Sequence, residues 1–358
     1  MLYTFLYPWH ETFSLLHVFK YITFRTFGGL FTALFFYFLI GRWVIRFCQQ
    51  SRWTQVIRKE GPQSHYQKQG TPTMGGLAIL FAVLFSALLW IDLKNLQFWL
   101  CAGLLLFYGL IGFYDDSRKI RYGSSQGLKG RHKFLLQVMG ALIVGVLLVT
   151  LFPIETKLSV PFFKNFQPDL GLFYPLFAVF VIVGASNAVN LTDGLDGLAT
   201  VPLIFSFATY GLFAYIAGHF AIATYLQIPY LVGTGELSIF CGAMIGALLG
   251  FLWFNTYPAE IFMGDVGSLS LGGVLGLLAL LTKNEILLAV VGGLFVLETV
   301  SVMTQVLSFR LTGKRIFRMA PIHHHFELKG WPEAKVSVRF WIISFLLSLV
   351  AIATLKLR

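Results

Sequence analysis

Ten long apolar segments constrain the fold of this 358-residue chain more than any other feature. Each has roughly the 17–25 residues that a helix needs to cross ~30 Å of hydrocarbon. Lipid offers no hydrogen-bond partners to an open backbone, so a spanning segment of this kind must form a helix. The segments cover residues 26–46, 74–91, 97–114, 134–152, 171–186, 198–217, 236–253, 267–282, 286–307 and 338–356.

The composition indicates the same apolar surroundings. Hydrophobic residues make up 57% of the chain and charged residues only 12%, which is more apolar than an ordinary soluble domain. The three cysteines fall in or beside different apolar segments and show no metal-ligand spacing, so no disulfide framework is expected. The sequence therefore predicts an all-α integral membrane protein with about ten transmembrane helices in one polytopic domain, residues 1–358.

Lysine and arginine are concentrated in the connections after the first, third and ninth segments. Because basic residues accumulate in cytoplasmic loops, these connections are predicted to face the cytoplasm. An even number of spans then leaves both termini on the opposite, periplasmic side. The same bias accounts for the net charge of +11, so the predicted partner is the lipid bilayer and not a nucleic acid. The predicted cytoplasmic loops cover residues 47–73, 115–133, 187–197, 254–266 and 308–337.

Acidic and amide side chains gather in these predicted loops. Asp115 and Asp116 close the third apolar segment, where their charges oppose the helix dipole. If that helix continues, Lys119 lies one turn further on and can pair with both aspartates. A second group shares an interval of three residues along one helical face, in and before the connection NLTDGLDG: Asn187, Asn190, Asp193 and Asp196.

Two further loops carry polar groups of the same kind. The segment NTYPAEIFMGDVG holds Asn255, Phe262 and Asp265 without any lysine or arginine. The glycines on either side of Asp265 suit a close approach of the backbone to a ligand. In the first loop, Lys68 and Thr73 could hold an anionic ligand, although a simple polar linker is the alternative for that stretch.

Three consecutive histidines, His323, His324 and His325, stand in the last predicted loop. Their side chains project in different directions, so they do not form the i, i+4 pair of a helical zinc site. They are better suited to donate hydrogen bonds to phosphate oxygens or to move a proton near neutral pH. Upstream, Glu298 and Ser301 lie on a polar stripe inside a span and are predicted to face the bundle interior.

Carboxylates and amides without thiolates favour Mg²⁺, which binds one or two protein carboxylates together with substrate phosphates. Nearby lysines and histidines supply the positive charge that phosphoryl transfer requires. A P-loop is excluded, because Gly313 and Lys314 are followed by Arg315 and not by Ser or Thr. An ion-coupled carrier is the alternative class, but the acidic residues gather at one membrane face and not at the midplane. The residues favour Mg²⁺-dependent phosphoryl transfer at the cytoplasmic face.

Five motifs, in order along essentially the whole chain, closely resemble those of the phospho-N-acetylmuramoyl-pentapeptide transferases. They are GTPTMGG (70–76), DDSRK (115–119), NLTDGLDG (190–197), NTYPAEIFMGDVGS (255–268) and PIHHHFELKGW (321–331). The resemblance implies a bacterial inner-membrane enzyme of peptidoglycan synthesis. Such an enzyme uses Mg²⁺ to transfer phospho-MurNAc-pentapeptide from UDP-MurNAc-pentapeptide to undecaprenyl phosphate, giving lipid I and UMP. Other polyprenyl-phosphate hexosamine-1-phosphate transferases share the aspartate motifs and are the alternative, but PIHHHFELKGW favours the muramoyl-pentapeptide member.

The resemblance also implies roles for individual residues. Asp265 is the leading Mg²⁺ ligand, and Asp115 and Asp116 lie where the lipid phosphate meets the metal. The three histidines contact the pyrophosphate or sugar phosphate, and Lys133 adds charge; these seven residues form the predicted catalytic set. The predicted substrate-binding set places Phe262 near uracil and Asn255 beside the metal, and comprises Lys68, Thr73, Asn187, Asn190, Asp193, Asp196, Asn255 and Phe262.

Two questions stay open at the level of the sequence. A phosphomonoester is mostly dianionic at neutral pH, so direct attack by the lipid phosphate is the favoured route, with Asp116 orienting or deprotonating it. A covalent aspartyl-phosphate route is the alternative, because carboxylates also act as phosphoryl nucleophiles. The small residues between Gly242 and Gly250 permit close helix contact, and a homodimer is one candidate use of that patch.

Overall fold

The computed structural model describes residues 1–54, 68, 70–123, 127–152, 155–161, 163 and 166–356. Within these ranges the regular secondary structure is helical, with two isolated β-bridges and no strand. Nine of the described helices are long and apolar enough to cross a membrane. The prediction of an all-α, multi-pass membrane protein is therefore confirmed.

The helices differ in length. The nine long ones are α2 (Ile22–Gln50), α4 (Leu96–Tyr122), α5 (Gly130–Leu151), α6 (Tyr174–Thr192), α7 (Thr200–Ala217), α9 (Leu237–Asn255), α10 (Gly264–Leu281), α12 (Gly293–Thr312) and α14 (Glu333–Ala353). The apolar helix α3 (Gly76–Trp90) has 15 residues, fewer than the ~20 of an ordinary span. The remaining short α-helices are α1 (Leu2–Leu6), α8 (Phe220–Leu226), α11 (Leu288–Val291) and α13 (Ile322–Glu327).

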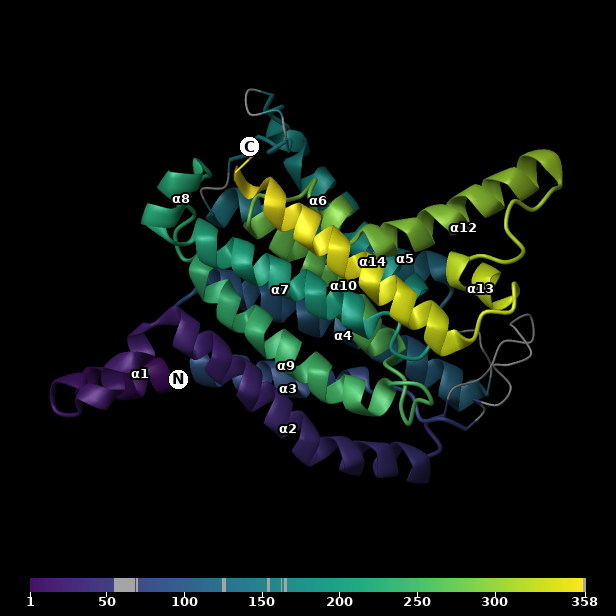
Figure 1. Ribbon diagram of the computed structural model, residues 1–358, viewed down its shortest axis with the longest axis horizontal. Helices are drawn as coiled ribbons and strands as arrows, with labels where there is room; N and C mark the ends of the chain where they lie inside the picture. Colours follow the sequence, from purple (N-terminus) through teal and green to yellow (C-terminus); the bar gives the residue numbers. More distant parts are fainter. Residues whose placement is uncertain are drawn as a thin grey trace.

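Several helices extend into the predicted loops, and α6 continues to Thr192, so Asn187 and Asn190 lie in a helix. Helix α4 continues to Tyr122, so Asp115 and Asp116 lie within the helix and not in a loop. The segment predicted as one span over 286–307 is divided into α11 and α12 at Gly292. Apolar residues continue through this break, so hydropathy alone does not reveal it, whereas glycine is a common site for a helix to bend. Helix α12 leans away from the bundle, as Figure 1 shows.

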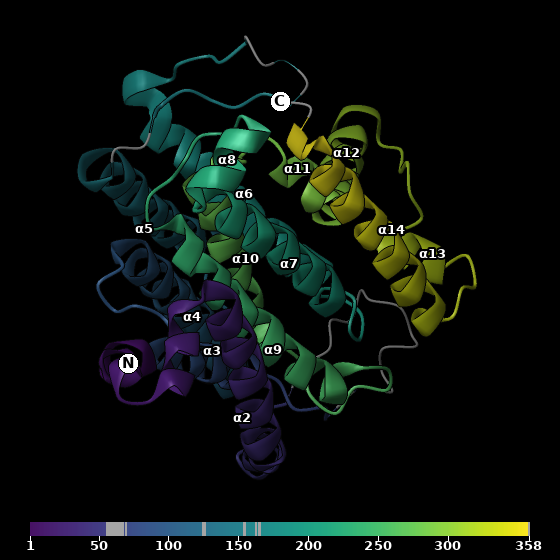
Figure 2. The same ribbon diagram turned by 60° about the vertical axis from the view of Figure 1, so that its left-hand side comes forward.

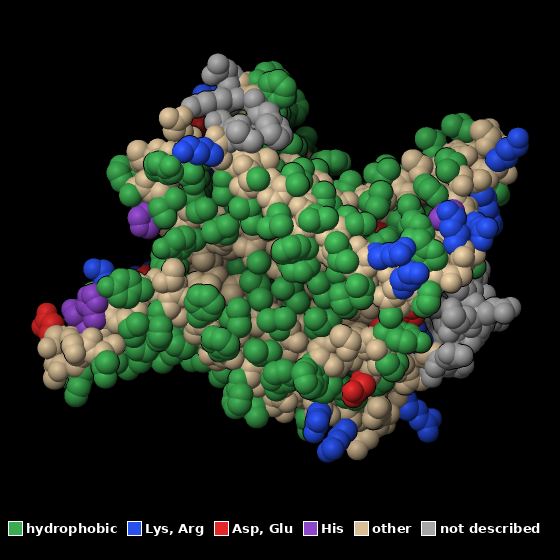
Figure 3. Space-filling model, viewed as in Figure 1, with side chains coloured by type: hydrophobic (Ala, Val, Ile, Leu, Met, Phe, Trp, Pro, Cys, Tyr) green, Lys and Arg blue, Asp and Glu red, His purple; other side chains and the backbone are tan. Residues whose placement is uncertain are grey.

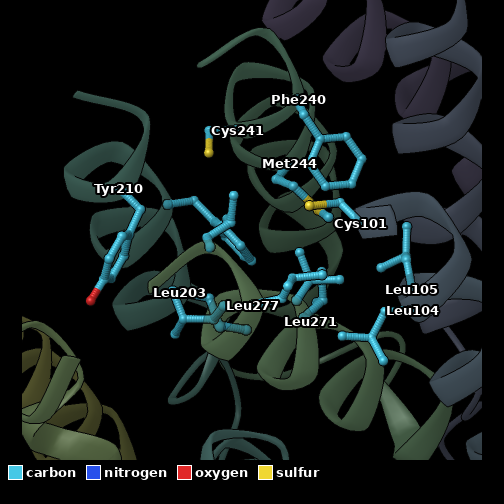
Figure 4. Close-up of a cluster of buried hydrophobic side chains, with 14 of the residues drawn as sticks. Cys101, Leu104, Leu105, Leu203, Tyr210, Phe240, Cys241, Met244, Leu271 and Leu277 are labelled. Atoms are coloured by element: carbon cyan, nitrogen blue, oxygen red, sulfur yellow. The ribbon is translucent and has the colours of Figure 1, made fainter. Parts of the chain in front are cut away.

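Helix α10 runs through the middle of the bundle, as two views show (Figures 1 and 2), and 89% of its most apolar stretch is buried. Glycine residues let its neighbours approach closely: a Cβ on Gly272 would lie 2.8 Å from the carbonyl oxygen of Ala185 on α6. The core beside α10 is filled from α4, α7 and α9, and Figure 4 shows Cys101, Leu105, Leu203, Tyr210, Phe240, Met244, Leu271 and Leu277 there. This packing fixes the position of the beginning of α10, which carries Asp265.

The surface has an apolar band and a basic end. Hydrophobic side chains cover the middle of the face in Figure 3, and most of its visible lysine and arginine side chains lie toward the end with α13 and the beginning of α14. The N-terminus and the last turn of α14 lie toward the opposite end (Figure 1). The polar groups predicted to be functional come from segments that meet at the basic end.

Helices α2 and α9 are packed through a row of glycines on α9. A Cβ on Gly242 would lie 2.5 Å from the carbonyl oxygen of Thr26, and one on Gly246 would lie 2.0 Å from that of Leu30. Glycines four residues apart allow two helix backbones to touch in this way. The small-residue patch that suggested a homodimer is therefore used inside the chain, against α2.

We expect Gly246→Ala to destabilise the protein, because the new methyl group has no space against α2. Overpacking of this kind costs about 1–3 kcal/mol, so thermal unfolding in detergent should begin at a lower temperature. Gly103→Ala on α4 is the matched control, because a Cβ there meets nothing within 4 Å. Equal unfolding temperatures for the two variants would contradict the assigned α2–α9 contact.

Candidate active site

Three carboxylates from two helices form the centre of the candidate site, and we call them the carboxylate cluster. Asp115 and Asp116 come from α4, and Asp265 comes from the first turn of α10. One oxygen from each residue lies within 4.8 Å of the other two. The structure thus brings together three residues that the sequence singled out in segments far apart along the chain.

Close backbone contacts hold the carboxylate cluster together. A Cβ on Gly112 of α4 would lie 2.3 Å from the carbonyl oxygen of Asp265, so α4 and α10 touch without an intervening side chain. Gly264 has a φ of +74°, a conformation that glycine adopts without strain. A Cβ on Gly264 would lie 2.7 Å from a carboxylate oxygen of Asp116. The close approach predicted beside Asp265 therefore occurs toward the protein's own carboxylate.

Two lysines balance the negative charge of the carboxylate cluster. The Nζ atom of Lys119 lies 2.6 Å from Asp115 Oδ2 and 3.0 Å from Asp265 Oδ2. It also lies 3.2 Å from Asp116 Oδ1, so it contacts all three carboxylates. Lys133, from the first turn of α5, donates to Asp265 Oδ2 and lies 3.8 Å from Asp115 Oδ2. Lys133 thus places a positive charge beside the carboxylate cluster. Lys119 pairs with Asp265 on α10 as well as with the two aspartates of its own helix.

The end of α6 adds an amide and a carboxylate. Asn190 Nδ2 donates to Asp265 Oδ1 at 2.9 Å and to Ser268 Oγ at 2.8 Å, which orients the Asp265 carboxylate. Burial raises the pKa of Asp193 to about 7, and the negative charges of Asp265 and Asp116 contribute to this rise. The local field therefore disfavours further negative charge and favours a cation.

The carboxylate cluster fits a divalent cation of the hard type. Its donors are carboxylate oxygens, which Mg²⁺ prefers, and no thiolate or imidazole is among the three residues. Asp115 and Asp116 are 2% and 5% exposed, so their charges need a cationic partner. In this structure Lys119 and Lys133 supply it, and a bound cation would use the same oxygens.

A second polar group lies around Lys68. Lys68 Nζ donates to Asp196 Oδ1 at 2.6 Å and also to Glu333 Oε1. It stands over the ring of Phe262, with 5.8 Å from Nζ to the ring centroid. Glu333 also accepts from the backbone N–H of Asp196, at 2.8 Å. Phe262 is half-buried, and its ring offers a stacking surface for a planar ligand beside the Lys68 ammonium, which the two carboxylates hold in place.

Backbone hydrogen bonds join the loops that carry these groups. The N–H of Phe262 donates to the carbonyl of Pro72, and the N–H of Gly75 donates to the carbonyl of Phe262. Thr73 is buried between them, and its N–H donates to Trp53. The GTPTMGG segment and the segment before Asp265 therefore form one unit.

Asn255 was predicted to lie beside the metal, but its side chain contacts other parts of the protein. Its Nδ2 donates to the carbonyl of Ile261, and its Oδ1 accepts from Gly197 N and Thr200 Oγ1. Since the residue is 2% exposed, its amide serves to join the end of α9 to the turn between α6 and α7. Asn187 likewise donates to Gln137 Oε1 and Val183 O, one turn before Asn190.

The three histidines lie in three environments. His323 is buried, with Nδ1 at 3.1 Å from Glu298 Oε2. His324 Nδ1 lies 2.7 Å from Glu327 Oε2. His325 Nδ1 accepts from the N–H of Arg318, so the neutral ring carries its proton on Nε2. Desolvation, followed by the charges of Lys329 and Arg318, lowers the pKa of His325. The triplet does not act as one unit.

Glu333 and Glu298 are absent from the predicted catalytic and substrate-binding sets. Glu333 follows Pro332 at the beginning of α14, where an acidic residue is also a common helix-terminal feature. Glu298 stands inside an apolar helix, and its intramembrane position was the available signal. It faces the interior, as predicted, together with Ser301.

A cavity of about 570 Å³ lies beside α12. Its walls combine apolar side chains such as Val302, Val306 and Phe309 with the guanidinium groups of Arg310 and Arg315. A lining that combines apolar side chains with arginines suits a ligand that joins a hydrocarbon chain to an anionic headgroup.

Comparisons with known proteins agree with this geometry. The model of glycosyl transferase family 4 matches residues 98–283, and the phospho-N-acetylmuramoyl-pentapeptide-transferase signature 1 matches residues 68–80. Three curated relatives carry the name phospho-N-acetylmuramoyl-pentapeptide-transferase, and the chain and each relative are covered in full. The relatives from Syntrophus aciditrophicus, Pelobacter propionicus and Desulfotalea psychrophila are 60%, 57% and 57% identical to this chain. The chain therefore belongs to the phospho-N-acetylmuramoyl-pentapeptide-transferase family, within glycosyl transferase family 4.

Proposed function

We propose that this protein transfers phospho-MurNAc-pentapeptide from UDP-MurNAc-pentapeptide to undecaprenyl phosphate, forming lipid I and UMP for peptidoglycan synthesis. The observation that carries the proposal is the carboxylate cluster of Asp115, Asp116 and Asp265 with Lys119 and Lys133 beside it. Two anionic substrates must meet there, and phosphoryl transfer depends on positioning and on neutralising charge. The family membership and the identity to the named relatives support the choice of substrates.

In the proposed complex, two regions of the protein bind different parts of the nucleotide substrate. Lys68, held by Asp196 and Glu333 over Phe262, would bind the nucleotide end. Lys133 and the side of α13 with His324 and His325 would face the phosphates. The reacting phosphorus then lies toward the carboxylate cluster.

Mg²⁺ is the proposed cofactor. Asp265 would be its leading ligand, with Asp115 and Asp116 as the other carboxylates of the set. When bound, it would neutralise phosphate charge near the reacting centre. Asn190, which donates to Asp265 Oδ1, would keep the other Asp265 oxygen directed toward the cluster.

The proposed membrane arrangement has ten spans, with α3 as the short one, in the bacterial inner membrane. Both termini would face the periplasm and the carboxylate cluster the cytoplasm. Most of the visible lysine and arginine side chains lie toward one end of the molecule, and the N-terminus lies toward the other (Figures 1 and 3). The bias of basic residues to cytoplasmic loops supports this orientation.

The proposed reaction is direct. An oxygen of the lipid phosphate attacks the phosphorus bonded to the sugar, the bond from that phosphorus to the UMP oxygen breaks, and UMP leaves with the bonding electron pair. Asp116 would orient the lipid phosphate. The carboxylates are already engaged: Asp115 Oδ1 accepts from Leu128 N at 2.7 Å, and Asp116 Oδ2 accepts from Val266 N at 3.3 Å. A dianionic phosphate needs no covalent relay through them.

Asp265→Asn is expected to lower Mg²⁺-dependent UMP release by on the order of 10²-fold or more, because it removes one negative charge from the metal ligands while preserving the side-chain volume. Release is measured in detergent with both substrates over a range of Mg²⁺ concentrations. Asp169→Asn, an exposed carboxylate bound to Thr156, is the control and should retain activity. Near-normal release by Asp265→Asn at saturating Mg²⁺ would refute the assignment.

Lys68→Ala is expected to raise the KM for the nucleotide substrate roughly 10-fold, the loss expected for a charge-assisted hydrogen bond, while the KM for the lipid stays unchanged. The two constants are measured in separate titrations, each at a saturating level of the other substrate. Lys335→Ala removes an exposed lysine at the same end of the molecule and serves as control. A change in the KM for the lipid, with the KM for the nucleotide substrate unchanged, would assign Lys68 to the lipid site and contradict the proposal.

Direct attack predicts that no UMP is released before the lipid phosphate is present. Rapid quench with labelled nucleotide substrate, Mg²⁺ and no lipid measures this release in the first turnover. Adding the lipid to the same sample provides the positive control. Release of one UMP per enzyme molecule in the absence of lipid would replace the direct route by the covalent aspartyl-phosphate route.

A further inference from the structure

Glu298 is a buried carboxylate in a predominantly apolar helix. It lies on α12, has an exposed fraction of 0%, and faces His323, whose Nδ1 is 3.1 Å from its Oε2. Neither Glu298 oxygen has a well-aligned hydrogen-bond partner among the described residues. An enclosed carboxylate costs several kcal/mol of desolvation that this one pairing must offset. Packing alone does not account for an acidic residue there.

The ring of His323 joins α12 to the turn between α6 and α7. His323 is 1% exposed, and its Nε2 would lie 2.5 Å from a Cβ on Gly194. The ring therefore rests directly on the backbone of the turn that carries Asp193 and Asp196. Any rotation of the ring would have to move that turn or open a gap against it.

A small hydrophobic cluster also joins these elements. Leu195 and Leu198 come from the α6–α7 turn, Leu294 from α12, and Val336 and Phe340 from α14. Ile322, Phe326 and Trp331, in and after α13, pack against them. Apolar packing is non-directional, so it holds the elements together without fixing one ring orientation. The Glu298–His323 contact adds a polar attraction between two particular side chains of α12 and α13.

We propose that Glu298 is a positioning residue for the transfer reaction. Through His323 it sets the α6–α7 turn, and with it Asp193 and Asp196, at a fixed distance from His324 and His325 on α13. This inference rests on the proposed function and assigns His323 to positioning and not to contact with the substrate. A site held by such a chain loses activity when its geometry relaxes by as little as 1 Å.

The test compares Glu298→Gln, His323→Asn and the double variant in Mg²⁺-dependent UMP release. Each single change is expected to lower kcat/KM for the nucleotide substrate on the order of 10-fold to 100-fold, without changing the KM for the lipid. The kcat/KM of the double variant should equal that of the less active single variant, because the two residues act as one unit. Additive losses, or activity of Glu298→Gln within about twofold of the unmodified protein, would overturn the proposal.

Glu285→Gln is the matched control for the loss of a buried glutamate charge. Glu285 is 4% exposed and pairs with Lys283 and Tyr174 at the opposite end of α10 from Asp265. The Glu285→Gln variant should unfold at a lower temperature and keep its kcat/KM within about twofold of the unmodified protein. An equal kinetic loss in Glu285→Gln would assign the Glu298 effect to general destabilisation.

Should Glu298→Gln fail to fold, Gly194→Ala tests the same contact, because the added methyl group would displace the His323 ring from the side of the α6–α7 turn. This variant should show the same loss of kcat/KM, and an unchanged kcat/KM would overturn the proposal.

The proposed function and this inference fail in different ways. Absence of UMP release from the unmodified protein, with both substrates and Mg²⁺, would reject the function. The same variants are then compared by thermal unfolding in detergent, where the pairing predicts that the shifts of Glu298→Gln and His323→Asn combine to less than their sum. Additive shifts in the unfolding temperature would reject the pairing itself.

Discussion

The contact between Gly112 on α4 and the backbone of Asp265 on α10 is the constraint on which the rest of the site depends. A methyl group at Gly112 would overlap the Asp265 carbonyl, so the two helices meet at the closest separation that backbones allow. Gly76 of α3 makes a similar contact with Gly267, two residues further along α10. These contacts bring Asp115 and Asp116, near the end of one helix, to Asp265 at the beginning of another. Rigid helices, and not loops, therefore set the spacing of the carboxylates.

The charge of the carboxylate cluster then dictates its surroundings. Three carboxylates at the rim of a low-dielectric bundle repel one another, and isolated they would be strongly disfavoured. Lys119 and Lys133 provide two positive charges, and the helix dipole at the beginning of α10 favours the Asp265 carboxylate. If a divalent cation and phosphates bind, Asp115, Asp116 and Asp265 would hold the cation, and Lys119 and Lys133 would be available to phosphate oxygens. Charge balance thus connects the ligand-free arrangement to the chemistry proposed for it.

Site residues could be predicted from the sequence where carboxylates stand at the ends of apolar segments. Asp115, Asp116 and Asp265 are such residues, because a carboxylate at the rim of an apolar bundle is costly, and the fold brings them together. Prediction failed where one residue type serves two purposes. Glu333 looks like an ordinary first-turn acid of α14, yet it binds Lys68, and Asn255 looks like a ligand-facing amide, yet it joins α9 to the α6–α7 turn. The break between α11 and α12 was not predicted, because hydropathy indicates whether a segment prefers an apolar environment and not whether its helix is continuous.

The α6–α7 turn connects the two halves of the site. Just before it, Asn190 reaches the carboxylate cluster through Asp265; within it, Asp196 reaches Lys68 and, through its backbone, Glu333. Gly197 is bound by Asn255, and Gly194 lies against His323. A segment with so many outside partners and little internal helix cannot set its own conformation, so the surrounding elements must set it together. Its order is therefore a property of the assembled bundle, and the turn links the proposed metal half of the site to the proposed nucleotide half.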